Sequence, residues 1–171
     1  DPAGEWSEPV WSESHHIDPS LFFDDDGQAY FTCNGRDGIY QWLIDIRTGQ
    51  RRSDIRHIWR GSGGWCAEAP HLYRIGGRYY LMIAEGGTEY GHMETLARSD
   101  TPWGPWEPCP FNPILTHRNH NAHGISGTGH ADLVQDPCGN WWAVFLAFRQ
   151  AGGFWHHLGR EAFLAPVRWT D

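Results

Sequence analysis

The chain carries one sequence unit three times, and this repeat limits the folds it can adopt more than any other feature. Each copy has a short apolar run containing a Leu, a turn that ends in Gly, and a second run rich in aromatic and aliphatic residues. The copies cover residues 18–33, 69–83 and 130–145, and their Leu residues are 51 and 61 positions apart. Each copy is typical of a β-hairpin. Hairpins repeated at this spacing favour a β-propeller, in which four-stranded sheets surround an axis.

The rest of the chain supplies the outer strands of an all-β fold. Residues 38–45 and 55–59 are expected to complete the first unit, and 94–99 and 105–108 the second. The sequence predicts blades at 15–60, 61–115 and 116–171, and the outer strand of a preceding blade at 1–14. Propellers close with four to eight blades, so the chain is expected to be part of a larger ring.

Composition excludes several classes of protein. An aromatic fraction of 15% is too high for a disordered chain. A net charge of −8 without an Arg cluster predicts no nucleic-acid partner. No apolar run reaches the ~20 residues of a membrane helix, and the first residues show no signal-peptide pattern, which leaves the cellular location open. The four cysteines lack the CxxC spacing, so we expect free thiols, although spacing leaves one disulfide open.

Three titratable residues stand where the inner strands of the blades begin. These positions lie near the axis of a propeller, and they hold Asp18, Glu68 and His130. Taken singly, Asp18 fits a turn, Glu68 a solvated loop, and His130 a hydrogen-bonded core. Their corresponding places in the repeat favour one shared site.

These units resemble glycoside hydrolase family 43. The resemblance is carried by residues 16–27, 68–73, 79–88, 129–134 and 158–161. It covers nearly the whole chain and is nearest to the β-xylosidase and α-L-arabinofuranosidase members. It implies a five-bladed propeller of which this chain covers blades three to five.

The resemblance implies a role for each candidate residue. Glu68 matches the general acid, and Asp18 matches the carboxylate that orients the acid and tunes its pKa. His130 matches a histidine near the sugar that in some members helps hold a central Ca²⁺ or its waters; no other cofactor is implied. Arg160 matches an arginine that reaches substrate hydroxyls or the carboxylates. The chain departs from the pattern at Ala69, where the family usually has Gly.

The implied reaction is inverting hydrolysis of terminal xylose or arabinofuranose from hemicellulose oligosaccharides, with the choice of sugar open. An acid needs a raised pKa, which the like charge of Asp18 beside Glu68 would supply. The family's general base is an Asp on the first blade, outside this chain, so the isolated chain is expected to be inactive or weak. Two alternatives stay open. One is a non-catalytic carbohydrate-binding or interaction propeller. The other is an assembly that self-associates, or recruits a complementing chain, through exposed blade edges.

Aromatic side chains and two further carboxylates complete the candidates. Trp65 is predicted to contact the apolar face of a pentose, and Phe22 and Phe154 are weaker candidates for the same contact. Asp132 and Glu85 are expected to make structural hydrogen bonds rather than to act in catalysis.

Overall fold

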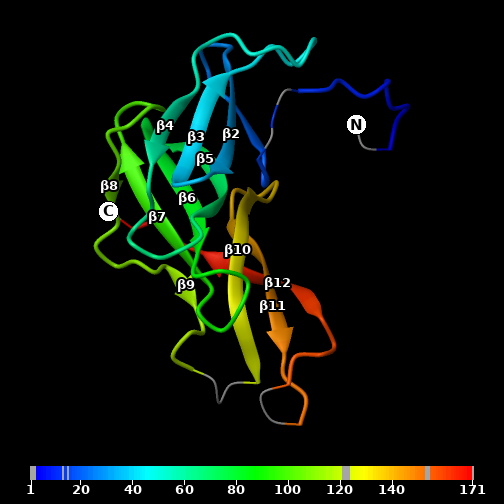
Figure 1. The fold of residues 1–171 in the computed structure, drawn as a ribbon, viewed down its shortest axis with the longest axis vertical. Coiled ribbons are helices and arrows are strands. Elements are labelled where there is room, and N and C mark those ends of the chain that lie inside the picture. Colours follow the sequence, from blue (N-terminus) through cyan, green and yellow to red (C-terminus); the bar gives the residue numbers. More distant parts are fainter. Residues whose placement is uncertain (1–2, 13, 15, 121–123, 153–154, 171) are drawn as a thin grey trace.

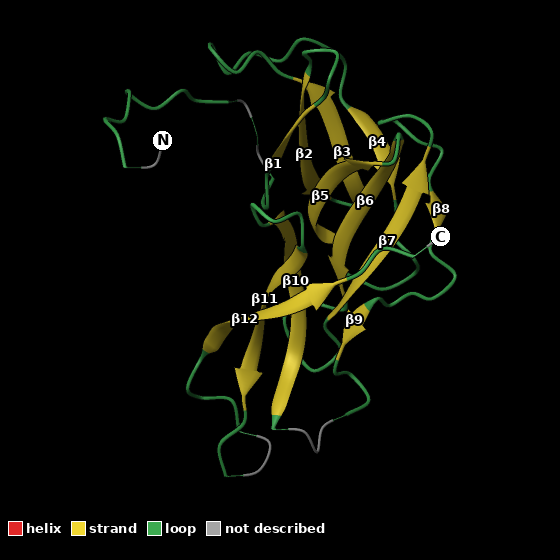
Figure 2. Ribbon diagram, turned by 180° about the vertical axis from the view of Figure 1, so that it is seen from behind, coloured by secondary structure: helices red, strands yellow, loops and turns green. Residues whose placement is uncertain are grey.

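The computed structural model of the chain describes residues 3–12, 14, 16–120, 124–152 and 155–170. Within these residues it contains twelve strands and no helix (Figure 2), which confirms the all-β prediction. Accordingly, the described part of the chain has no helix with the length and apolar character that crossing a bilayer requires.

Sheet 1 is a four-stranded antiparallel meander. Its strands lie in chain order: β1 (Ser20–Phe23), β2 (Ala29–Gly35), β3 (Gly38–Leu43) and β4 (Arg56–Trp59). The β1–β2 turn closes through a hydrogen bond from Gly27 N to Asp24 O, and Gly27 has a φ of 81°, which suits glycine. The hairpin predicted from the Asp-rich turn is therefore confirmed.

Sheets 2 and 3 repeat this plan. Sheet 2 contains β5 (Glu68–Ile75), β6 (Arg78–Glu85), β7 (Met93–Ser99) and β8 (Glu107–Pro108), with β9 (Leu115–Thr116) also paired to β7. Sheet 3 contains β10 (Ile125–Gln135), β11 (Trp141–Arg149) and β12 (Arg160–Val167). The sequence did not predict β9 or β12. A two-residue strand has no pattern to detect, and β12 ends in a Pro-containing stretch that weakens the strand signal.

The three sheets follow one another along the long axis of the molecule. Sheet 1 is blue to cyan, sheet 2 mostly green, and sheet 3 yellow to red (Figure 1). The first strand of sheet 2, β5, contacts the first strands of both neighbours, β1 and β10. This arrangement brings the three inner strands together, as the repeat predicted.

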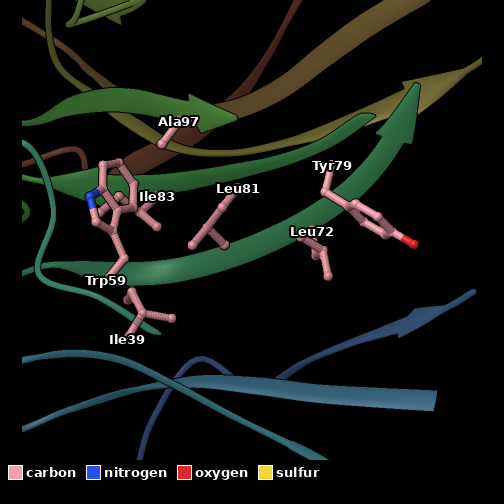
Figure 3. Close-up of a cluster of buried hydrophobic side chains, with 7 residues drawn as sticks. All are labelled: Ile39, Trp59, Leu72, Tyr79, Leu81, Ile83 and Ala97. Carbon is pink, nitrogen blue, oxygen red and sulfur yellow. The ribbon is translucent and has the colours of Figure 1, made fainter. Parts of the chain in front are cut away.

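Apolar cores join the neighbouring sheets. Between sheets 1 and 2 lies a buried cluster, shown in Figure 3: Ile39, Trp59, Leu72, Tyr79, Leu81, Ile83 and Ala97. Between sheets 2 and 3 lie Met82, Ala131, Ala143 and Phe145. Burying one large aliphatic or aromatic side chain stabilises a fold by about 1.5–3 kcal/mol. The cores therefore fix how the inner strands meet.

Residues 3–12 and 14, which belong to the expected outer strand at 1–14, form no strand. A strand is stabilised by the ladder of hydrogen bonds to its neighbour. The other strands of that preceding blade are expected outside the chain, so the outer strand stays a prediction.

The four cysteines are free thiols, as expected. Cys33 is buried in the core of sheet 1, and burial raises the pKa of its thiol to about 11. Cys66 stands in the loop that leads into β5, two residues before Glu68.

Candidate active site

A non-glycine residue in the left-handed backbone conformation lies in, or just before, the first strand of each sheet. The three are Asp18 (φ 54°), Ala69 (φ 45°) and His130 (φ 52°). Each lies three positions before the Leu of its repeat. The repeat predicted that His130 begins its strand, but β10 begins at Ile125, so His130 lies within it. The strand register also shifts here, between Glu68 and His71 in sheet 2 and between Gly129 and Asp132 in sheet 3. Residues that carry a Cβ rarely adopt this backbone conformation, and those that do are concentrated at functional sites.

The backbone conformation corrects one prediction, namely that Asp18, Glu68 and His130 occupy corresponding positions in the repeat. The counterpart of Asp18 and His130 is Ala69, and Glu68 lies one position earlier. In sheet 3 the counterpart of Glu68 is Gly129, because both residues stand directly before the register shift.

The structure brings Asp18, Glu68 and His130 together. Asp18 Oδ2 accepts a hydrogen bond from Ala69 N at 3.1 Å, directly beside Glu68. Burial raises the pKa of the Glu68 carboxyl, and the negative charge of Asp18 raises it further. His130 and a hydrogen bond from the Cys66 thiol act in the opposite direction, and the net shift is upward. A carboxyl with a raised pKa keeps its proton to a higher pH, which suits a general acid.

A second carboxylate makes the equivalent contact at the next sheet interface. Glu94 of β7 is fully buried, and its Oε1 accepts a hydrogen bond from Ala131 N at 3.0 Å. Burial raises the pKa of Glu94 to about 8. At both interfaces, therefore, a carboxylate of one sheet accepts a backbone hydrogen bond from the next sheet: from the left-handed residue Ala69 itself in sheet 2, and from the residue after left-handed His130 in sheet 3. The sequence did not predict this role, because Glu94 has no counterpart in the motif that singled out Asp18.

Two histidines that the sequence did not single out also lie at the site. His71 of β5 is mostly buried, and burial lowers the pKa of its imidazole; Asp18, His130 and Asp132 act on it electrostatically. His92 is buried, and its Nδ1 lies 3.0 Å from Gly127 O. The one available signal for His71 was its place directly before the Leu of the second repeat.

Arg160 is linked to this cluster through His92. It is the first residue of β12 and is exposed. Burial lowers the pKa of His92, and the charges of His130 and Arg160 lower it further. His130 and Arg160 therefore both lie close enough to His92 to act on its charge.

Glu85 and Asp132 make the structural hydrogen bonds expected of them. The buried Glu85 carboxylate accepts hydrogen bonds from Ser62 N, Gly64 N and Thr95 Oγ1 at 3.0, 2.8 and 2.6 Å. It thereby holds the loop that carries the candidate Trp65. Asp132 accepts a hydrogen bond from Tyr73 Oη at 2.6 Å.

The predicted aromatic contacts have different surroundings. The Trp65 side chain is 64% exposed. Its ring covers Gly87, where an added Cβ would approach ring carbons to 2.7 Å. The ring of Phe22 packs against Tyr30 and Tyr79, at centroid distances of 6.1 and 6.2 Å. This packing accounts for Phe22 without a sugar. Phe154 lies outside the described residues.

The resemblance allowed a calcium ion near His130. Across the described ranges, no group of three or more His, Cys, Asp or Glu side chains has the arrangement needed to hold a metal ion. An ion held through waters would not need such a group, so the calcium ion near His130 stays a prediction, and no step below involves a metal.

The family is decided by comparison with known proteins. The profile described as "Glycosyl hydrolases family 43" matches residues 1–171. The chain belongs to glycosyl hydrolase family 43. Among its relatives, this family 43 chain is 48% identical over 169 residues to "Non-reducing end alpha-L-arabinofuranosidase BoGH43B" of Bacteroides ovatus, covering 98% of the chain and 32% of that protein. It is 43% identical to "Xylosidase/arabinosidase" of Butyrivibrio fibrisolvens, covering 100% and 36%.

Solved structures of the family agree. The chain superposes on "Bacteroides ovatus Xyloglucan PUL GH43B" with a TM-score of 0.94 and 47% identity, covering 99% of the chain and 34% of that protein. It superposes on xylan beta-1,4-xylosidase from Bacillus halodurans C-125 with a TM-score of 0.93 and 35% identity, covering 100% and 34%. The family 43 chain thus spans about a third of the length of these relatives.

Proposed function

We propose that this chain is the acid-bearing part of an inverting glycosidase. The enzyme removes terminal xylose or arabinofuranose from hemicellulose oligosaccharides. The names of the relatives, an arabinofuranosidase and a xylosidase/arabinosidase, support this substrate class. One observation carries the assignment of the acid: Asp18 binds the backbone beside Glu68, whose pKa is raised by burial and by that carboxylate.

In the proposed reaction Glu68 donates its proton to the glycosidic oxygen as the bond from that oxygen to the anomeric carbon breaks. A water molecule attacks the same carbon from the opposite face and gives its proton to a second carboxylate. Inverting enzymes place the two carboxyl groups roughly 6.5–9.5 Å apart, which leaves room for this water. We assign the base to a blade outside this chain, as the resemblance implies.

The remaining candidates bind the sugar in this proposal. His130 and Arg160 contact hydroxyl groups at the end of the site where their charges act together on His92. The exposed ring of Trp65 packs against the apolar C–H face of the pentose. A contact between Phe22 and the sugar stays a prediction. The reaction requires no cofactor.

The terminal sheets support a larger ring, with 15–60, 61–115 and 116–171 as blades three to five. Leu21 and Phe23 alternate along β1 on one face of sheet 1 and are 50% and 60% exposed. On sheet 3, the paired residues Val144 and Leu164 are 42% and 61% exposed. Neighbouring blades, a second copy or a complementing chain would bury such apolar faces.

Chromogenic xyloside and arabinofuranoside substrates test the function. We expect little or no turnover by the isolated chain. Co-expression with the polypeptide that carries the first two blades is expected to produce turnover, and Glu68→Gln to abolish it. Robust turnover by the isolated chain that survives Glu68→Gln would disprove both the acid and the external base. A completed protein without turnover on either sugar would disprove the substrate class.

A further inference from the structure

The two bulges that carry Glu68 and His130 end at residues that face each other. In sheet 2 the strand register shifts between Glu68 and His71, and in sheet 3 it shifts between Gly129 and Asp132. His71 and Asp132 are therefore the first residues in regular register after the bulges. Any contact between them acts directly on the positions of the two bulges.

His71 and Asp132 do make contact across the interface between sheets 2 and 3. His71 Nδ1 lies 3.5 Å from Asp132 Oδ1. The same Oδ1 accepts a hydrogen bond from Tyr73 Oη at 2.6 Å. Tyr73 Oη in turn accepts a hydrogen bond from Leu133 N at 2.9 Å. Three polar contacts thus join β5 to β10 next to the candidate acid and the candidate sugar-binding histidine.

We propose that Tyr73, Asp132 and His71 form an inter-sheet clamp that fixes the position of Glu68 relative to His130. They are positioning residues, because they act through the backbone of the two bulges. This inference rests on the proposed function only in treating Glu68 as the acid.

The electrostatics of Glu68 make the clamp testable. The side chains that act on the pKa of Glu68 are Asp18 on sheet 1, His130 on β10 and Cys66 in the adjacent loop. A change in either clamp residue is therefore expected to alter the pKa of Glu68 mainly by moving its carboxyl relative to these groups. A looser bulge lets water reach Glu68 and separates it from Asp18, so its pKa falls towards the ordinary value.

The experiment is a pH titration of the Glu68 carboxyl carbon by ¹³C NMR in the 171-residue chain, assigned with Glu68→Gln. His71→Ala and Asp132→Ala are each expected to lower the pKa of Glu68 by about 0.5–1 unit. The double variant is expected to shift it no further than the larger single shift, because the two residues act as one unit. His71→Gln, which retains a donor for Asp132, is expected to restore most of the wild-type value.

Asp136→Asn is the matched control. Asp136 lies just beyond the other end of β10 and hydrogen-bonds Asn140 and Trp142. This variant removes an Asp contact elsewhere in sheet 3, and we expect no shift in the pKa of Glu68. An unchanged pKa of Glu68 in folded His71→Ala and Asp132→Ala would overturn the clamp, as would an equal shift in Asp136→Asn. If the alanine variants do not fold, Asp132→Asn retains the oxygen that Tyr73 binds and must give a smaller shift in the same direction. The readout is a pKa, so it does not depend on whether the chain hydrolyses glycosides.

Discussion

Asp18 is linked to the candidate acid through the backbone: its Oδ2 accepts a hydrogen bond from the N–H of Ala69 at 3.1 Å. Both residues have the left-handed conformation and occupy the same place in successive repeats. One short contact therefore holds the bulge of sheet 2 against sheet 1 and keeps a negative charge near Glu68.

The first prediction concerns the charge of Asp18. In Asp18→Asn the amide oxygen can still accept from Ala69 N, but the negative charge is lost. The pKa of Glu68 is therefore expected to fall by about 0.5–1 unit in a carboxyl ¹³C titration. Asp26→Asn, in the outer turn of the same sheet, is the control and should have no effect. An unchanged Glu68 pKa in Asp18→Asn would show that Asp18 does not tune the acid.

The second prediction concerns Ala69. Replacing it with Gly relieves about 1–2 kcal/mol of left-handed strain, which offsets the loss of a buried methyl group and the extra freedom of the unfolded chain. We expect Ala69→Gly to change the free energy of unfolding by less than about 0.5 kcal/mol in urea titrations. Ala97→Gly, equally buried on β7 without a positive φ, should lose about 1–2 kcal/mol. Equal losses in both variants would refute the strain argument.

The third prediction is a pH dependence set by Glu94. Its folded pKa of about 8 lies above the ordinary glutamate value of 4.5, so between these values the folded chain holds a proton that the unfolded chain has lost. Stability from this group is therefore complete below pH 4.5 and declines as the pH rises to about 8. The lowered pKa values of His71 and His92 act in the opposite direction, but only below 6.5.

Urea unfolding between pH 6.5 and 8 isolates the Glu94 contribution. The wild type should lose stability over this window, and Glu94→Gln should lose markedly less. If both proteins show the same slope, Glu94 is not the group that titrates.

The fourth prediction compares two tyrosine–aspartate hydrogen bonds of equal length. Tyr79 Oη donates to the buried carboxylate of Asp24 at 2.6 Å, and Tyr40 Oη donates to the exposed Asp37 at 2.6 Å. Tyr79→Phe leaves a buried carboxylate oxygen without this donor, so it should cost about 1–3 kcal/mol. Tyr40→Phe should cost less than about 0.5 kcal/mol, because water replaces the lost donor. Urea titrations measure the free energy of unfolding of both variants, and equal losses in the two would contradict the role of burial.

The fold was largely predictable because its signals are local. A turn such as the one ending in Gly27 between alternating residues predicts a hairpin without tertiary information. The repeat also showed that Asp18 and His130 occupy equivalent positions, but it did not show that β10 begins at Ile125, five residues before His130. Glu68 was grouped with them although it lies one residue before the second copy, which begins at Ala69.

The contacts between sheets could not be predicted. Glu94 looks in the sequence like an ordinary charged residue of a strand, and its burial becomes visible only when sheets 2 and 3 pack. The same holds for the clamp, because His71 and Asp132 are 61 positions apart in the chain. Pairing at that distance depends on how whole sheets stack.

The central claim is that Glu68 is the general acid, and leaving-group dependence tests it most directly. The measurement is kcat/KM in the protein completed with its first two blades, for wild type and Glu68→Gln. One substrate has a poor, sugar leaving group, and the other a dinitrophenolate that departs without a proton. If Glu68 is the general acid, Glu68→Gln is expected to lower kcat/KM by about 10²–10⁴-fold on the substrate with the sugar leaving group and much less on the dinitrophenolate substrate. An equal loss on both substrates, or no loss on the first, would contradict it.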